Sequence, residues 1–145
     1  MSISLSIVIP TKNRPSDLSV AISSIIPQME PADSLIIVDQ SDNPFSNPSI
    51  ETKKNIYYHY SPFINGLVQA KHHSLSFAKN NVVVFLEDDI ELSTNYLSNV
   101  RSAFHDQRLI AGCGTEIKSS NSYLYRLLFN LSHLGPFYDP RVSCV

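Results

Sequence analysis

The sequence predicts an α/β domain in which helices flank a mostly parallel sheet. Short runs of consecutive apolar residues alternate with segments of helical periodicity, which is the pattern of βαβ units. One run, Val82 to Leu86, holds three β-branched residues and suits a strand that is covered on both faces. It is followed at once by Glu87, Asp88 and Asp89. Because open α/β sheets bind ligands at the carboxyl ends of their strands, these carboxylates mark the first candidate site.

Length and composition predict an ordinary soluble globular domain. A chain of 145 residues can bury about 70% of the surface that it exposes when unfolded. The charged fraction of 17%, the net charge of −2 and the scattered basic residues exclude a disordered chain and argue against nucleic-acid binding.

Neither a membrane span nor a signal peptide is expected. Nowhere do 18 apolar residues run together, and the N-terminal apolar run is cut short at Pro10 and Lys12. Cys113 and Cys144 match no zinc-binding spacing, so we expect no disulfide framework and a reducing, cytoplasmic compartment.

The first βαβ unit begins with an apolar run at residues 2–9, which predicts a strand that ends at Pro10. Residues 11–15 form a polar loop at its carboxyl end. Ser16 or Asp17 is then expected to cap a helix. Its buried apolar stripe would consist of Leu18, Ala21, Ile22 and Ile25.

Two further strands are predicted after the first helix. Residues 35–38 form a short buried strand that delivers Asp39, Ser41 and Asp42 to the edge where the first loop lies. Residues 56–60 form a third strand near the border of the sheet, and we interpret its tyrosines as packing residues.

The second half of the domain continues the alternation. A helix is expected over residues 66–79, with Lys71 near the carboxyl edge of the sheet. The residues expected to face the sheet are Leu67, Ala70, His73 or Ser74, Leu75 and Ala78. Ser93 should cap a helix at residues 94–105, and residues 109–113 read as a last short strand. The adjacent His72 and His73 point in different directions on a helix, so they are interpreted as structural.

A strongly apolar segment, residues 123–137, lies beyond this pattern. As a helix it is apolar nearly all round, which leaves two interpretations open. It is either a core helix or an exposed surface that contacts a membrane periphery or another protein.

The acidic cluster needs a compensating partner or open solvent. Two carboxylates 4 Å apart repel by about 4 kcal/mol at an effective dielectric near 20. Oxygen ligands select hard ions such as Mg²⁺ or Mn²⁺, which take one or two protein carboxylates and complete their shell with phosphates. The alternatives are a solvated turn and an arginine that neutralises the carboxylates, which would remove the need for an ion.

Four stretches, in this order and spacing, resemble the nucleotide-sugar half of family 2 glycosyltransferases of the GT-A fold. They are Ser-Ile-Val-Ile-Pro-Thr-Lys-Asn-Arg at 6–14, the strand that ends in Asp39, Gly-Leu-Val-Gln-Ala-Lys at 66–71 and Phe-Leu-Glu-Asp-Asp-Ile-Glu-Leu at 85–92. The resemblance therefore implies a Rossmann-like nucleotide-sugar-binding domain at residues 1–115. Residues 116–145 would be the start of an incomplete acceptor-side region.

The resemblance implies a role for each matching position outside the acidic motif. Asp39 would hydrogen-bond the pyrimidine ring, and Lys71 would reach the base or the diphosphate. The nucleoside pocket would be lined by residues of the first loop, which are Pro10, Thr11, Asn13 and Arg14.

The acidic motif corresponds to the Asp-any-Asp motif of the family. Asp89 would bind the metal, Asp88 would contact the ribose or the ion, and Glu87 would face the ribose. Glutamate at the first position is a departure from the family pattern. No catalytic base is assigned, because neither Glu116 nor Asp139 lies in a recognisable motif.

The resemblance implies metal-assisted transfer of a sugar with inversion at the anomeric carbon, from a nucleoside diphosphate sugar of the UDP or dTDP type. The acceptor would be a saccharide or a lipid-linked molecule in bacterial polysaccharide assembly. The missing base leaves open a truncated enzyme, a protein completed by a partner, and a non-catalytic nucleotide-sugar-binding module. A nucleotidyltransferase is disfavoured because no Gly-rich, lysine-bearing loop follows the first strand.

Overall fold

The computed structural model describes residues 3–51, 53–106 and 108–114, and a first compact unit ends at Ile110. Its sheet has four parallel strands in the order β3-β2-β1-β4. The strands are β1 (Leu5–Thr11), β2 (Ser34–Asp39), β3 (Ile56–Tyr60) and β4 (Val82–Phe85). The predicted α/β class with a parallel sheet is confirmed, and β3 lies at the border of the sheet as expected.

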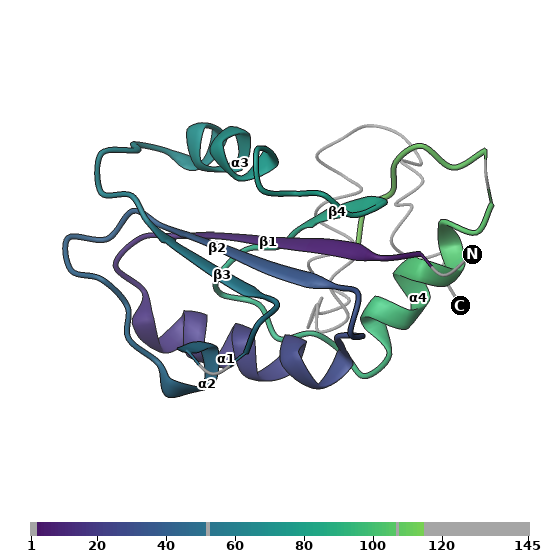
Figure 1. Ribbon diagram of the computed structural model, residues 1–145, viewed down its shortest axis with the longest axis horizontal. Helices are drawn as coiled ribbons and strands as arrows, with labels where there is room; N and C mark the ends of the chain where they lie inside the picture. The colour runs from purple at the N-terminus through teal and green to yellow at the C-terminus, as the bar shows by residue number, and fades with distance from the viewer. Residues whose placement is uncertain (1–2, 52, 107, 115–145) are drawn as a thin grey trace, which may run out of the picture. The chain divides into compact units, whose positions relative to one another are not determined.

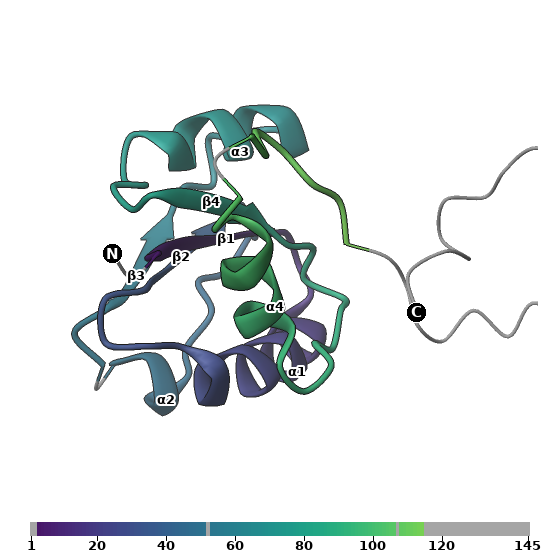
Figure 2. The ribbon, with the colours of Figure 1, turned by 90° about the vertical axis from the view of Figure 1, so that its right-hand side faces the viewer.

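Helices cover both faces of the sheet (Figures 1 and 2). α1 (Pro15–Ile25) and α4 (Tyr96–Ala103) lie on one face, and α3 (Leu67–Leu75) lies on the other. A 3₁₀ turn, η1 (Ile26–Gln28), extends α1, and a short helix, α2 (Pro48–Glu51), precedes β3. No helix in the described part of the chain is long and apolar enough to cross a bilayer.

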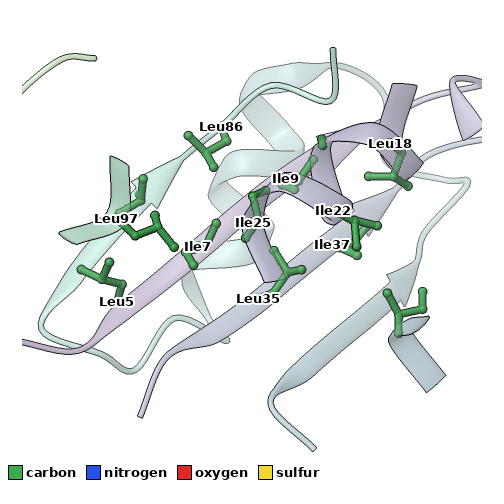
Figure 3. Packing of buried hydrophobic residues seen from close by; sticks show 13 residues of the cluster. Leu5, Ile7, Ile9, Leu18, Ile22, Ile25, Leu35, Ile37, Leu86 and Leu97 are labelled. Carbon is green, nitrogen blue, oxygen red and sulfur yellow. The ribbon is translucent and has the colours of Figure 1, made fainter. Parts of the chain in front are cut away.

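The core follows from strand alternation. In β1, Ile7 and Ile9 face α1, whereas Val8 faces α3 and packs with Ala70. Every residue of β1 is buried, as expected of a central strand with helices on both sides. Figure 3 shows the larger cluster, in which side chains of β1 and β2 meet the stripe predicted for α1, namely Leu18, Ala21, Ile22 and Ile25.

Pro10 does not end β1, contrary to the prediction. The Leu86 N–H donates to the Val8 carbonyl at 2.9 Å, so Val8 and Pro10 turn their backbone groups toward β4. The pairing with β4 stops at Val8 and Phe85. The missing N–H of Pro10 therefore costs no ladder bond, and β1 continues to Thr11 beside β2.

Two strand predictions differ from the structure where a neighbouring strand is missing from the described sheet. β4 borders the described sheet, so Phe85 is 41% exposed and only Val84 of this strand is buried. The expected cover on both faces of β4 therefore holds for Val83 and Val84, which pack in the two core clusters, but not for Phe85. Residues 109–113 form no strand, and Ile110 is 92% exposed. An isolated extended segment has no partner for its backbone groups.

The predicted helix caps are also wrong. α1 begins at Pro15, which suits the first helical position because it needs no N–H donor there, and it has no side-chain cap. α4 begins at Tyr96 after Asn95, whose φ of 70° is left-handed, so Ser93 does not cap it.

The helix predicted over residues 66–79 is shorter than expected. α3 stops at Leu75, and Leu67 and Leu75 are 45% and 48% exposed. Ala70 and Ser74, which the sequence also predicts to face the sheet, form its buried face. The apolar segment at residues 123–137 lies outside the described residues.

Candidate functional site

Three strand ends are aligned at one edge of the sheet. Thr11 of β1 pairs with Asp39 of β2, which in turn pairs with Tyr60 of β3. The loops that follow these strands lie at the same end of the sheet in Figure 1. Residues that are far apart in sequence therefore converge where parallel α/β sheets bind ligands.

Asn13 connects the loop after β1 to the loop after β2 through hydrogen bonds. Its φ of 58° is left-handed, a conformation that asparagine tolerates better than most residues. Its backbone N–H donates to Ser41 Oγ at 2.7 Å. Its side-chain amide donates to Asp42 Oδ2 and accepts from the Asp42 N–H, both at 3.0 Å. The amide is thus used to hold the loop after β2.

Asp39 is fully buried and accepts three hydrogen bonds. Oδ1 accepts from the Ser41 N–H at 2.9 Å. Oδ2 accepts from the Phe45 N–H at 3.0 Å and from the Tyr58 hydroxyl at 2.6 Å. Burial, and then the bond to Asp39, raise the pKa of Tyr58 well above its ordinary value, so the hydroxyl stays protonated and donates. Asp39 therefore orders the loop that follows it.

A pocket of about 270 Å³ opens beside these loops. It has an apolar wall formed by Leu18, Pro44 and Phe45, and polar groups lie around it, which is the usual make-up of a small-molecule site. Of the predicted nucleoside-pocket residues, its lining includes Thr11, Asn13 and Asp39. The remaining lining residues are Pro15, Ser41 and Asn43.

Pro10 and Arg14 are not among the lining residues. Pro10 is buried within β1. Arg14 turns to the acidic motif, where its Nη1 lies 3.2 Å from Asp88 Oδ1 and 3.0 Å from Asp89 Oδ2. The carboxylate of Asp88, and to a smaller extent that of Asp89, raises the pKa of the Arg14 guanidinium.

The two aspartates differ in their surroundings. The Asp88 side chain is only 9% exposed, and its Oδ2 accepts from Thr11 Oγ1 at 2.8 Å. The Asp89 side chain is 55% exposed and meets Arg14 through Oδ2. Asp88 is therefore built into the strand ends, whereas Asp89 faces solvent.

Lys71 and Glu87 form a second ion pair at this edge. Lys71 Nζ, on α3, lies 2.9 Å from Glu87 Oε1. The same nitrogen lies 5.7 Å from the centroid of the Phe85 ring, within the range of a cation–π contact. The structure thus brings the predicted Lys71 to the acidic motif rather than to the pocket.

Arg14 neutralises both aspartates of the acidic motif, which is the arginine alternative to a bound ion. Two carboxylates converge on a single positive nitrogen of Arg14, and carboxylate oxygens are ligands that Mg²⁺ and Mn²⁺ prefer. Asp89 fits such an ion because it is exposed. Asp88 fits less well, because Thr11 and Arg14 already engage its two oxygens. Within the described residues, no three His, Cys, Asp or Glu side chains form a metal-binding group.

The sequence matches the protein family described as Glycosyl transferase family 2 over residues 6–142. The chain belongs to this family. A sequence search of curated proteins finds no significant match.

Solved structures share the fold of this family 2 chain. The crystal structure of S. aureus TarS residues 1–349 matches it with a TM-score of 0.61 and 18% identity, over 79% of this chain and 38% of that one. A second S. aureus TarS structure matches with a TM-score of 0.60 and 18% identity, over 79% of this chain and 23% of that one. These matches confirm the expected GT-A fold, and the chain spans well under half the length of either structure.

Sequence reasoning missed several residues of the site in this family 2 chain. Tyr58 is one of the tyrosines that the sequence indicates as packing residues, yet its hydroxyl donates a hydrogen bond to Asp39. The alternation along β3 places Tyr58 on the face opposite Tyr57 and His59, and this was the available signal. Phe45 and Asn43 lie in an irregular loop whose path no periodicity predicts. Glu116 and Asp139 lie outside the described residues.

Proposed function

We propose that this chain carries the donor site of a glycosyltransferase that takes a sugar from a nucleoside diphosphate sugar. One observation carries the proposal: Thr11 both lines the pocket and donates a hydrogen bond to Asp88. The pocket with its apolar wall and the acidic motif paired with Arg14 therefore meet at Thr11. A donor molecule with a flat base at one end and a diphosphate at the other matches that arrangement.

The size of the pocket supports binding of one ring rather than of the whole donor. Its volume of about 270 Å³ lies at the lower end of the range for ligand sites, roughly 300 to 1,000 Å³. A pyrimidine ring between Leu18 and Phe45 would leave the phosphates outside, toward the acidic motif. UDP and dTDP are therefore the proposed nucleotides, and Asp39 would act mainly by holding the loop of Phe45.

Charge at the acidic motif suits departure of a nucleoside diphosphate. The acceptor oxygen attacks the anomeric carbon from the face opposite the phosphate, the carbon–oxygen bond to the phosphate breaks, and its electron pair leaves with the diphosphate. This gives inversion. A Mg²⁺ or Mn²⁺ ion held by Asp89 would stabilise the negative charge of that leaving group. Arg14 and Lys71 can add positive charge beside it.

The acceptor proton must pass to a base, and the described carboxylates at the motif are all engaged. Glu87 pairs with Lys71, and Asp88 and Asp89 pair with Arg14. This observation favours a second candidate, a non-catalytic module that binds nucleotide sugars. For the enzyme, the proposed acceptor is a saccharide or a lipid-linked molecule used in bacterial polysaccharide assembly, and the proposed location is the cytoplasm or the membrane periphery.

Calorimetric titration of the 145-residue chain with UDP and dTDP, each with and without Mn²⁺, tests the proposal. Binding that Mn²⁺ strengthens, together with release of UDP from a UDP-sugar, supports the enzyme. Metal-strengthened binding without turnover supports the module. ADP is the matched control, because its larger purine should fit the pocket poorly. No binding of either pyrimidine nucleotide would refute both candidates.

A further inference from the structure

Arg14 is fixed at its backbone, whereas its charged end is held only by ion pairs. It lies between Asn13, which is clamped to the next loop, and Pro15, the first residue of α1. Its side chain is 51% exposed. Exposed ion pairs contribute little net stability, because water screens the charges and the long side chains lose conformational entropy. The guanidinium can therefore exchange partners without moving α1 or the loop.

The structure shows which of its two bonds can be exchanged. Asp88 is nearly buried and keeps its bond from Thr11, so leaving it without a cation would cost desolvation energy. Asp89 is 55% exposed, and water can replace Arg14 there. Arg14 and a divalent ion would both use Asp89, and they repel each other.

We infer that Arg14 fills the cation position at Asp89 while the donor is absent, and that it must release Asp89 before a divalent ion binds there. This inference rests on the metal-assisted form of the proposed function. The displaced guanidinium has five N–H donors in a fork that matches phosphate oxygens. A diphosphate would thus give Arg14 a new partner, so nucleotide and ion should each strengthen the binding of the other.

The test compares Mn²⁺ binding by the full chain without nucleotide, measured from the loss of the free-ion electron paramagnetic resonance signal. Arg14→Gln should bind Mn²⁺ more tightly than the wild type by about three- to tenfold. The upper value is the factor that repulsion between a +1 and a +2 charge about 6 Å apart gives in water. In the presence of UDP this gain should shrink, because the variant also loses a phosphate contact.

Lys12→Gln is the matched control, because Lys12 lies in the same loop but donates to Asn65 rather than to a carboxylate. It should leave Mn²⁺ affinity within about twofold of the wild type, since screening weakens charges at a distance. Arg14→Lys keeps the charge and should also stay near the wild type. Thermal unfolding of each variant shows that it is folded.

The inference is overturned if Arg14→Gln binds Mn²⁺ no more tightly than Lys12→Gln, or if neither the wild type nor Arg14→Gln binds Mn²⁺. Failure of the inference can be distinguished from failure of the proposed function. Failure of UDP and dTDP to bind, with the Mn²⁺ gain present, would refute the function alone. Nucleotide binding without the Mn²⁺ gain would refute the inference alone.

Discussion

The hydroxyl of Tyr58 donates a 2.6 Å hydrogen bond to Asp39 Oδ2, across the pair of strands β2 and β3. The hydroxyl oxygen of Tyr58 also accepts from the Phe45 N–H at 2.7 Å. One side chain of the border strand thus ties the end of β2 to the loop that walls the pocket. The position of Phe45, and with it the shape of the pocket, depends on this connection.

Tyr58→Phe should weaken UDP binding several-fold and lower the free energy of unfolding by about 1 kcal/mol, the usual net contribution of one hydrogen bond. The phenyl ring keeps the packing but cannot hold Asp39 and Phe45. Isothermal titration and chemical denaturation measure the two effects. Tyr57→Phe is the control, because Tyr57 is 48% exposed and lies on the other face of β3. Equal losses in both variants would contradict the proposed role of Tyr58.

Asp89→Asn should weaken the Mn²⁺-dependent part of UDP binding by about tenfold or more, because an amide is a poor substitute for a charged oxygen ligand. The melting temperature should change little, since the side chain is 55% exposed. Glu91→Gln, an exposed neighbour outside the ion-pair cluster, serves as the control. A large fall in the melting temperature of Asp89→Asn would mark this residue as structural instead.

Thr11→Val should destabilise the fold by about 1.5 to 3 kcal/mol, the range for a lost hydrogen bond to a charged group. Valine matches threonine in shape but leaves Asp88 Oδ2 without its donor in a nearly buried position. Urea denaturation checks the value. Thr94→Val, at an exposed position, should change the stability by less than about 0.5 kcal/mol. Similar stability of the two variants would show that the Thr11–Asp88 bond contributes nothing.

The free energy of unfolding should fall as the pH is lowered, and His59 should account for part of this fall. Its ring stacks on Phe77 with centroids 3.8 Å apart, and His73 lies 6.5 Å away. Burial, and then the charge of His73, lower the pKa of His59 below its ordinary value. The unfolded chain therefore binds this proton more readily. The contribution of His59 is complete above the ordinary pKa of about 6.5 and is lost as the pH falls below it.

His59→Gln should therefore flatten the dependence of the unfolding free energy on pH between about 6.5 and 5, the region just below the ordinary histidine pKa. His72→Gln should retain the wild-type slope, because His72 is exposed on α3. Urea denaturation at a series of pH values gives both slopes. Parallel curves for His59→Gln and the wild type would show that His59 titrates alike in the folded and unfolded chains.

Much of the fold could be predicted because the buried strands are recorded in the sequence as apolar runs. The predicted bounds of β3 agree with the structure, and β2 differs only at its ends. Errors fall where a neighbour decides the outcome. Pro10 remains in β1 because the pairing with β4 has already ended, and residues 109–113 form no strand. Local residue preferences contain no information on which neighbour is present.

For the candidate site, the order of motifs along the chain was enough to choose the family and the edge of the sheet that carries the polar residues. It could not predict their pairing. Whether Arg14 turns to the pocket or to Asp89, and whether Tyr58 packs or bonds Asp39, depends on side-chain directions at three strand ends.

By itself, the sequence determined the four strands of the described sheet, their parallel arrangement and the polar residues at their carboxyl ends, because apolar runs and motif spacing can be read along the chain. Only the tertiary structure decided which charges meet: Arg14 with Asp88 and Asp89, and Lys71 with Glu87. The physical reason is that an ion pair depends on distances of a few ångströms between residues that the fold brings together from opposite ends of the domain.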